Sequence, residues 1–413
     1  MNKRLIAILT GIILIFSLTY YYVKHIDTDK FSILDNEVQN SIGVNIHFVK
    51  PNPNETKKIY NAGFKTVRMD IIWNQIEKKR GVYDFSKYDE LVNELDKNKV
   101  NILFILGYSN ALYDNGLAPY SEHGRQAFAN FASKAVKRYK GKSIMWEIWN
   151  EPNGGGFWKP KPNVESYYKF AMNTITAIRS VDRNAFIVAP ALAGVDYSYL
   201  DYLGKNNLFK YIDAVSIHPY RQRNPETVIG DYNKIKDLID KYPHKDGIKL
   251  FCGEWGYSTA SKDMDETKQS QYCVREYLTN LMCGINLTIW YDWRNDGTDP
   301  KNKEHNFGCV YNNLEPKKAY YAITTLTSVL QNYKFVKRID DGQNSDYILM
   351  FKKGNKTTYA FWTTGNSHGI NMQLPCNNIK VVDLKGNNYN DRVIDNLYNI
   401  DISNSVTYIT DLD

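Results

Sequence analysis

The chain has 413 residues, enough for one large domain and a small one, and its 43% hydrophobic content argues against disorder. The net charge of +7 is spread along the sequence without a basic block, so nucleic-acid binding is not predicted. The five cysteines are odd in number and form no C-x-x-C pair, which predicts neither a disulfide framework nor a zinc site. Cys252 is expected to be a small core residue.

The first 30 residues read as a targeting segment. Lys3 and Arg4 precede an uncharged stretch, Leu5 to Val23, that is long enough to cross a bilayer as a helix. The leading positive charges predict a cytoplasmic N-terminus and export of the remainder. Because no small-x-small cleavage site follows, we expect a retained signal-anchor over residues 1–30, with the protein facing outside. A cleaved signal peptide and a secreted protein are the alternative.

From about residue 41, short apolar runs alternate with longer helical patterns, which predicts a (β/α)8 barrel over residues 38–330. Ser86 and Ser121 lie where helix N-caps are expected. The eight expected strands are Gly43–His47, Thr66–Ile71, Val100–Leu106, Ile144–Trp149, Phe186–Pro190, Ala214–His218, Ile248–Glu254 and Leu287–Trp293. The expected helices include Ser86–Asn98, Glu122–Tyr139, Val164–Val181, Glu226–Lys241, Glu266–Cys283 and, last in the barrel, Lys317–Leu330.

A doubly wound open sheet is the competing architecture, but it often carries a glycine-rich phosphate loop after its first strand. Here His47–Pro51 follows the first strand and contains no glycine. Barrel enzymes carry their catalytic residues at the C-terminal ends of the strands. Counting strands places Glu151 after the fourth and Glu254 at the end of the seventh, so both are catalytic candidates by position alone.

After Leu330 the pattern changes to short strands separated by turns rich in Gly, Asn and Asp. This predicts a small β-sandwich over residues 331–413, which either braces the barrel or binds carbohydrate. The strands expected in it are Tyr347–Phe351, Thr357–Trp362, Ile379–Asp383 and Thr407–Ile409.

Two glutamates at the ends of buried strands are the groups that cleavage of a glycosidic bond requires. One carboxylic acid protonates the leaving oxygen, and the other carboxylate attacks the anomeric carbon or activates a water. Their surroundings must therefore separate their pKa values. Aromatic neighbours such as Trp149 and Trp158 would keep Glu151 protonated by desolvation. Hydrogen bonds from Arg68 and Tyr220 would keep Glu254 ionised.

Residues Trp146–Asn153 have the sequence Trp-Glu-Ile-Trp-Asn-Glu-Pro-Asn, and a glutamate also ends the seventh expected strand. Together these two features resemble the clan of retaining β-glycosidases that are built on (β/α)8 barrels. That clan includes the cellulase-like family 5 and the xylosidase-like family 39 glycoside hydrolases, and the local pattern is closest to family 39. The resemblance covers about residues 40–330. It implies that Glu151 is the acid/base and Glu254 the nucleophile.

The resemblance also assigns substrate-binding residues. Asn150 would contact the sugar 2-hydroxyl, Tyr220 would hydrogen-bond the nucleophile, and Arg68 would support it. Trp290 or Trp293, at the end of the eighth strand, would be the aromatic platform for the reactive sugar. His47 and His218 are expected to line the same subsite, and Trp73 and Trp158 either stack on outer sugars or cover the barrel mouth.

The expected activity is hydrolysis of a β-linked poly- or oligosaccharide, such as an exopolysaccharide or a cell-surface glycan. A transglycosylase, or a non-catalytic polysaccharide-binding surface protein, are the alternatives. No metal or organic cofactor is predicted, because no ligand cluster is visible. The sugar, the linkage and the oligomeric state are left open.

Overall fold

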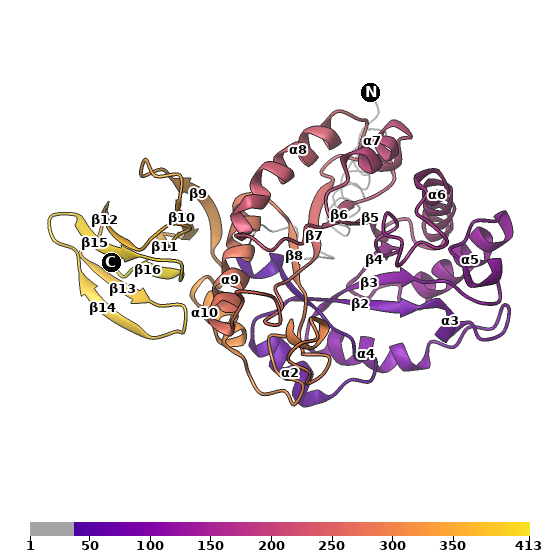
Figure 1. Ribbon diagram of the computed structural model, residues 1–413, viewed down its shortest axis with the longest axis horizontal. Coiled ribbons are helices and arrows are strands. Elements are labelled where there is room, and N and C mark those ends of the chain that lie inside the picture. The colour runs from indigo at the N-terminus through magenta and orange to yellow at the C-terminus, as the bar shows by residue number, and fades with distance from the viewer. Residues whose placement is uncertain (1–36) are drawn as a thin grey trace, which may run out of the picture.

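The computed structural model describes residues 37–413, and the expected anchor over residues 1–30 lies outside this range. Eight parallel strands close into a barrel in chain order, which confirms the predicted (β/α)8 fold (Figure 1). The strands are β1 (Ile42–Asn45), β2 (Thr66–Ile72), β3 (Asn101–Gly107), β4 (Ile144–Ile148), β5 (Phe186–Ala193), β6 (Ala214–His218), β7 (Lys249–Trp255) and β8 (Leu287–Trp290).

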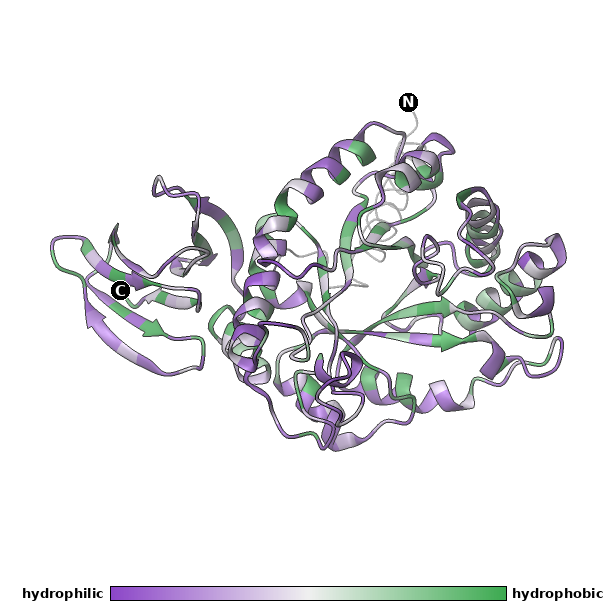
Figure 2. Cartoon of the chain, viewed as in Figure 1, coloured by the Kyte–Doolittle hydropathy of each residue, from purple (hydrophilic) through white to green (hydrophobic). Residues whose placement is uncertain are grey.

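Helices surround this barrel and present their apolar faces to the strands. They are α2 (Pro53–Asn61), α3 (Trp73–Ile76), α4 (Ser86–Lys97), α5 (Glu122–Arg138), α6 (Val164–Val181), α7 (Tyr197–Lys205), α8 (Ile229–Asp240), α9 (Glu266–Met282) and α10 (Lys318–Val329). The barrel strands are largely hydrophobic, whereas the surrounding helices carry both hydrophobic and hydrophilic residues (Figure 2). Within residues 37–413, no helix combines the length and apolar composition needed to cross a membrane.

One of the two expected serine caps is confirmed. The Ser121 side chain caps α5 by accepting a hydrogen bond from the Gly124 amide. The Ser86 expectation is wrong, because Ser86 is already the first helical residue of α4 and its amide donates to the Asp84 carboxylate.

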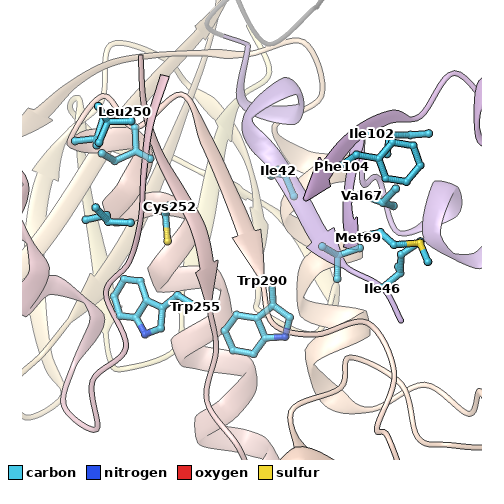
Figure 3. Packing of buried hydrophobic residues seen from close by; sticks show 14 of the residues in the cluster. Ile42, Ile46, Val67, Met69, Ile102, Phe104, Leu250, Cys252, Trp255 and Trp290 are labelled. Carbon is cyan, nitrogen blue, oxygen red and sulfur yellow. The ribbon is translucent and has the colours of Figure 1, made fainter. Parts of the chain in front are cut away.

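Successive side chains along each barrel strand point alternately into two hydrophobic layers, one outside the barrel and one inside it. Outward side chains such as Ile102 and Phe104 pack under the helices (Figure 3). Inward side chains fill the barrel floor, where Phe186 and Phe251 stack with ring centroids 5.9 Å apart. The period-two alternation of strand side chains produces both layers from one sequence. The filled floor closes the barrel from below, so only its upper end is available for chemistry.

The C-terminal region consists of two packed antiparallel sheets, as the predicted β-sandwich requires. A six-stranded sheet in the order β14-β13-β16-β11-β10-β9 is covered on one face by the pair β12–β15. Its other face continues the hydrophobic cluster of the barrel, beside α9 and α10 (Figure 1). The strands are β9 (Lys334–Ile339), β10 (Asp346–Lys353), β11 (Lys356–Thr363), β12 (His368–Gln373), β13 (Asn378–Val382), β14 (Asn388–Arg392), β15 (Leu397–Ile402) and β16 (Thr407–Asp411).

All five cysteines are buried and free. Cys252 is fully buried on β7, as expected of a small core residue.

A buried ion pair fastens the sheet to the barrel. Arg275 on α9 donates to both carboxylate oxygens of Glu226, at 2.7 and 2.8 Å. Trp362 on β11 donates its indole N–H to the same carboxylate at 2.7 Å. Arg275 is fully buried and Glu226 is 6% exposed, so each side chain depends on the other for charge compensation.

We expect Glu226→Gln to lower the free energy of unfolding by about 3–5 kcal/mol, because it leaves the Arg275 charge buried without a partner. Denaturant unfolding of the full chain measures this loss.

Glu276→Gln is the matched control. Glu276 on α9 is fully buried, and neither of its oxygens has a hydrogen-bond partner among the described residues. Burial raises the pKa of its carboxyl well above the ordinary value, so the group is uncharged and glutamine replaces it without loss of charge. Equal losses of stability in both variants contradict the ion-pair interpretation.

Candidate active site

Polar side chains form a layer above the apolar floor, where the strands end. On β4 the inward residue changes from Met145 to Glu147, and on β6 from Ala214 to Ser216 and then His218. Gly253 on β7 leaves space for the Ser216 side chain in this layer, because a Cβ at position 253 would lie 2.1 Å from the Ser216 hydroxyl. The strands therefore carry hydrophobic residues below and hydrogen-bonding residues above.

Arg68 on β2 lies at the centre of the polar layer and is 1% exposed. Its Nε donates to Glu147 at 2.6 Å, and one terminal nitrogen donates to Glu254 at 2.6 Å. The other terminal nitrogen donates to the amide oxygen of Asn150 at 2.7 Å. Burial alone would lower the pKa of Arg68, but the carboxylates of Glu147 and Glu254 raise it, so the guanidinium stays charged.

Glu254 is held by the two donors that the sequence predicts. Besides Arg68, the Tyr220 hydroxyl donates to its second carboxylate oxygen at 2.9 Å. Burial raises the pKa of Glu254, but His218, Arg68 and these hydrogen bonds outweigh burial and lower it below the ordinary value. The expected direction of the shift is confirmed, and the carboxylate is ionised at neutral pH.

Glu151 follows β4 and faces Glu254 across His218. Its Oε1 lies 3.0 Å from His218 Nδ1, and Glu254 Oε2 lies 4.0 Å from the same nitrogen. An oxygen of Glu151 lies within 4.8 Å of an oxygen of Glu254. The side chain of Glu151 is 17% exposed and that of Glu254 15%, so both carboxylates reach the solvent-facing side of the layer.

His47 follows β1 and lies 37% exposed at the edge of the site. Its Nδ1 is 2.8 Å from Asp296, and its Nε2 is 2.9 Å from the Asn45 amide. Burial lowers the pKa of His47, but the Asp296 hydrogen bond and the charges of Asp292, Asp296 and Asp70 raise it to about 9. His47 is therefore a cation at neutral pH, and both of its ring nitrogens already lie within hydrogen-bond distance of protein side chains.

The indoles of Trp290 and Trp293 do not form the expected platform. Both are buried, at 0 and 1% exposure, and the indole N–H of Trp293 donates to Glu55 at 3.0 Å. Trp73 and Trp158 are likewise buried, at 1 and 2%, so the interpretation as outer sugar platforms is wrong and they pack in the core.

Tyr291, between the two tryptophans, reaches the site in their place. Its ring lies 5.4 Å from His47 and 6.4 Å from Tyr220, measured between centroids. Its hydroxyl donates to Glu304 at 3.0 Å. Glu147 was not predicted to belong to the site, although a charged residue in the middle of an apolar strand, two positions after inward Met145, is a usable signal.

Two groups of side chains have the spacing of metal ligands: His47 with Asp292 and Asp296, and Glu151 with His218 and Glu254. The sequence analysis saw neither. In each group a histidine nitrogen already lies within hydrogen-bond distance of a carboxylate, at 2.8 and 3.0 Å, which accounts for the grouping without an ion.

The sequence matches the family model described as cellulase (glycosyl hydrolase family 5) over residues 29–297. It is 25% identical over 218 residues to an endoglucanase of Clostridium saccharobutylicum, covering 50% of this chain and 42% of the relative. It is 28% identical over 115 residues to a β-xylosidase of Geobacillus stearothermophilus, and this match covers 26% of this chain and 22% of the relative. The chain thus spans less than half the length of either relative.

Solved structures share the fold. A family 39 glycoside hydrolase from Bacteroides cellulosilyticus WH2 superposes with a TM-score of 0.78 at 24% identity, covering 92% of this chain and 82% of that one. A family 39 β-xylosidase from Caulobacter crescentus superposes with a TM-score of 0.68 at 15% identity, and the match covers 90% of this chain and 95% of that one. At these identities the likeness extends to the architecture, including the C-terminal region.

We expect Tyr220→Phe to raise the pKa of the Glu254 carboxyl by up to about one unit, because one hydrogen bond to the charged form is lost. Titration of the labelled carboxyl by NMR measures the shift. Tyr291→Phe is the control, since its hydroxyl donates to Glu304 and not to Glu254. An unchanged Glu254 pKa in Tyr220→Phe contradicts the hydrogen bond.

Proposed function

Because the chain belongs to the cellulase family, glycosyl hydrolase family 5, we propose that it is a retaining β-glycoside hydrolase that acts on β-linked poly- or oligosaccharides. The observation that carries the retaining mechanism is that one carboxylate oxygen of Glu151 lies within 4.8 Å of one carboxylate oxygen of Glu254. Retaining enzymes hold their carboxyl groups about 5–5.5 Å apart, whereas inverting enzymes leave about 6.5–9.5 Å for a water. The spacing here supports direct attack by a carboxylate.

In the proposed reaction, Glu254 attacks the anomeric carbon while Glu151 protonates the leaving oxygen. The glycosyl group is then covalently bound to Glu254, and Glu151, now ionised, takes a proton from the water that releases it. The ion pair with Arg68 and the hydrogen bond from Tyr220 suit Glu254 to this role, because they keep its carboxylate charged. The partly exposed carboxyl of Glu151 suits it to exchange protons.

The remaining site residues are proposed to bind the reactive sugar. Asn150, oriented by Arg68, contacts a hydroxyl beside the anomeric carbon. Cationic His47 lies at the β1 side of the subsite, and the ring of Tyr291 provides the aromatic surface that the sequence assigned to Trp290 or Trp293.

Glu254→Gln and Glu151→Gln are both expected to abolish hydrolysis of the polysaccharide substrate, with losses of at least about 10²–10⁴-fold. With an aryl β-glycoside whose leaving group needs no proton, Glu151→Gln should still form the glycosyl-enzyme, whereas Glu254→Gln should not.

A panel of aryl β-glycosides and polysaccharides, tested with the full chain, identifies the sugar.

Glu165→Gln is the control for these variants, because Glu165 lies exposed on α6 and pairs only with Lys169 among the described residues.

NMR of the first-formed product gives its anomeric configuration. A β product supports retention, and an α product contradicts it.

We also propose that the protein acts outside the cell, tethered by the stretch from Leu5 to Val23. Sequencing of the mature N-terminus in the membrane fraction is expected to return the initial residues. A start near residue 30 contradicts the tether and favours secretion.

A further inference from the structure

Two aromatic side chains at the loops after β3 and β4 have no part in the proposed reaction. Phe157 lies in the loop after β4 and is 39% exposed. Tyr108 follows β3, and its ring centroid lies 5.8 Å from that of Phe157 at an interplanar angle of 31°. The two rings form an aromatic pair in which Phe157 is exposed and Tyr108 is half-buried.

The loop that carries Phe157 is fixed in shape. The Gly154 amide donates to the Glu151 carbonyl at 2.8 Å, and the amides of Phe157 and Trp158 both donate to the Gly154 carbonyl. Trp158 is buried against Trp149, with centroids 5.3 Å apart. The chain therefore buries the residue after Phe157 and holds Phe157 itself outside.

The loop also passes directly beside the Glu151 carboxyl. A Cβ placed on Gly154 would lie 3.8 Å from Glu151 Oε2. On the other side of the pair, the Tyr108 hydroxyl donates to Asp70 at 2.7 Å, and Asp70 lies on β2 two residues after Arg68. The aromatic pair thus connects the loop after β4 to Asp70, which lies above Arg68 toward the open end of the barrel.

Among the described residues, Phe157 is the only phenylalanine whose side chain is exposed, and it offers an apolar ring to a ligand in the cleft. The C–H face of a pyranose is a suitable cover for an aromatic ring. The group that Glu151 protonates is the oxygen of the leaving sugar, so that sugar lies on the Glu151 side of the cleaved bond. Phe157 is on this side, whereas His47 and Tyr291 are at the ends of β1 and β8.

We propose that Phe157, supported by Tyr108, is the stacking platform for the pyranose ring of the leaving group. This inference rests on the proposed glycoside hydrolase function. It makes Phe157 a determinant of the leaving group that the enzyme accepts and leaves the reactive sugar to the residues around Arg68.

The experiment compares two substrates of the same sugar in the full chain: a β-linked oligosaccharide, and the glycosyl fluoride, whose leaving group is too small to reach the platform. Phe157→Ala is expected to lower kcat/KM for the oligosaccharide about tenfold and to change it less than about twofold for the fluoride. Phe157→Trp is expected to keep the wild-type preference. Tyr321→Ala, on exposed Tyr321 of α10, is the matched control.

Equal losses of kcat/KM on both substrates in Phe157→Ala overturn the proposal, because they indicate that Phe157 only shapes the loop around Glu151. An unchanged kcat/KM on both substrates also overturns it. In either case an active wild-type protein leaves the proposed function standing. A wild-type protein that cleaves neither substrate contradicts the proposed function, and the platform is then overturned with it.

Discussion

The site depends on one buried positive charge, the guanidinium of Arg68. A charge that is 1% exposed is unfavourable unless neighbouring groups compensate it, and here Glu147 and Glu254 do so. Because these partners come from β4 and β7, the barrel must close in one register for the charge to be satisfied. The same contacts orient Asn150 and keep Glu254 ionised, so fold and site share a single electrostatic requirement.

Much of this arrangement could be predicted, because the barrel strands carry strong apolar runs. Ala214–His218 has the predicted bounds, and the contacts of Arg68 and Tyr220 with Glu254 follow from the strand ends at which they lie. The prediction failed where the strand itself ends. β8 stops at Trp290, so alternation could not tell which following residue faces the cleft, and Tyr291 was missed. β14 was missed because all five of its residues are exposed and carry no apolar pattern.

The chain after β4 adopts a conformation that sequence patterns do not encode. Trp149 and Glu151 both have positive φ, 68° and 47°, in a region that costs side-chain-bearing residues about 1–3 kcal/mol each. The surroundings enforce it: the Glu151 amide donates to the Ala191 carbonyl, and the Asn153 side chain pairs with both backbone groups of Ala193. β5 thereby directs the Glu151 carboxyl into the cleft while Trp149 packs in the core.

Because its five cysteines are buried and unpaired, the folded and the unfolded protein would react differently with oxidants in an oxidising environment. In the folded chain all five thiols are buried, so oxidants have little to react with. A molecule that unfolds exposes five thiols, and an odd number cannot be paired completely within one chain. At least one remains to form a bond with another molecule, so unfolding under oxidising conditions becomes irreversible. In such an environment the lifetime of the folded protein would be set by its unfolding rate rather than by its equilibrium stability.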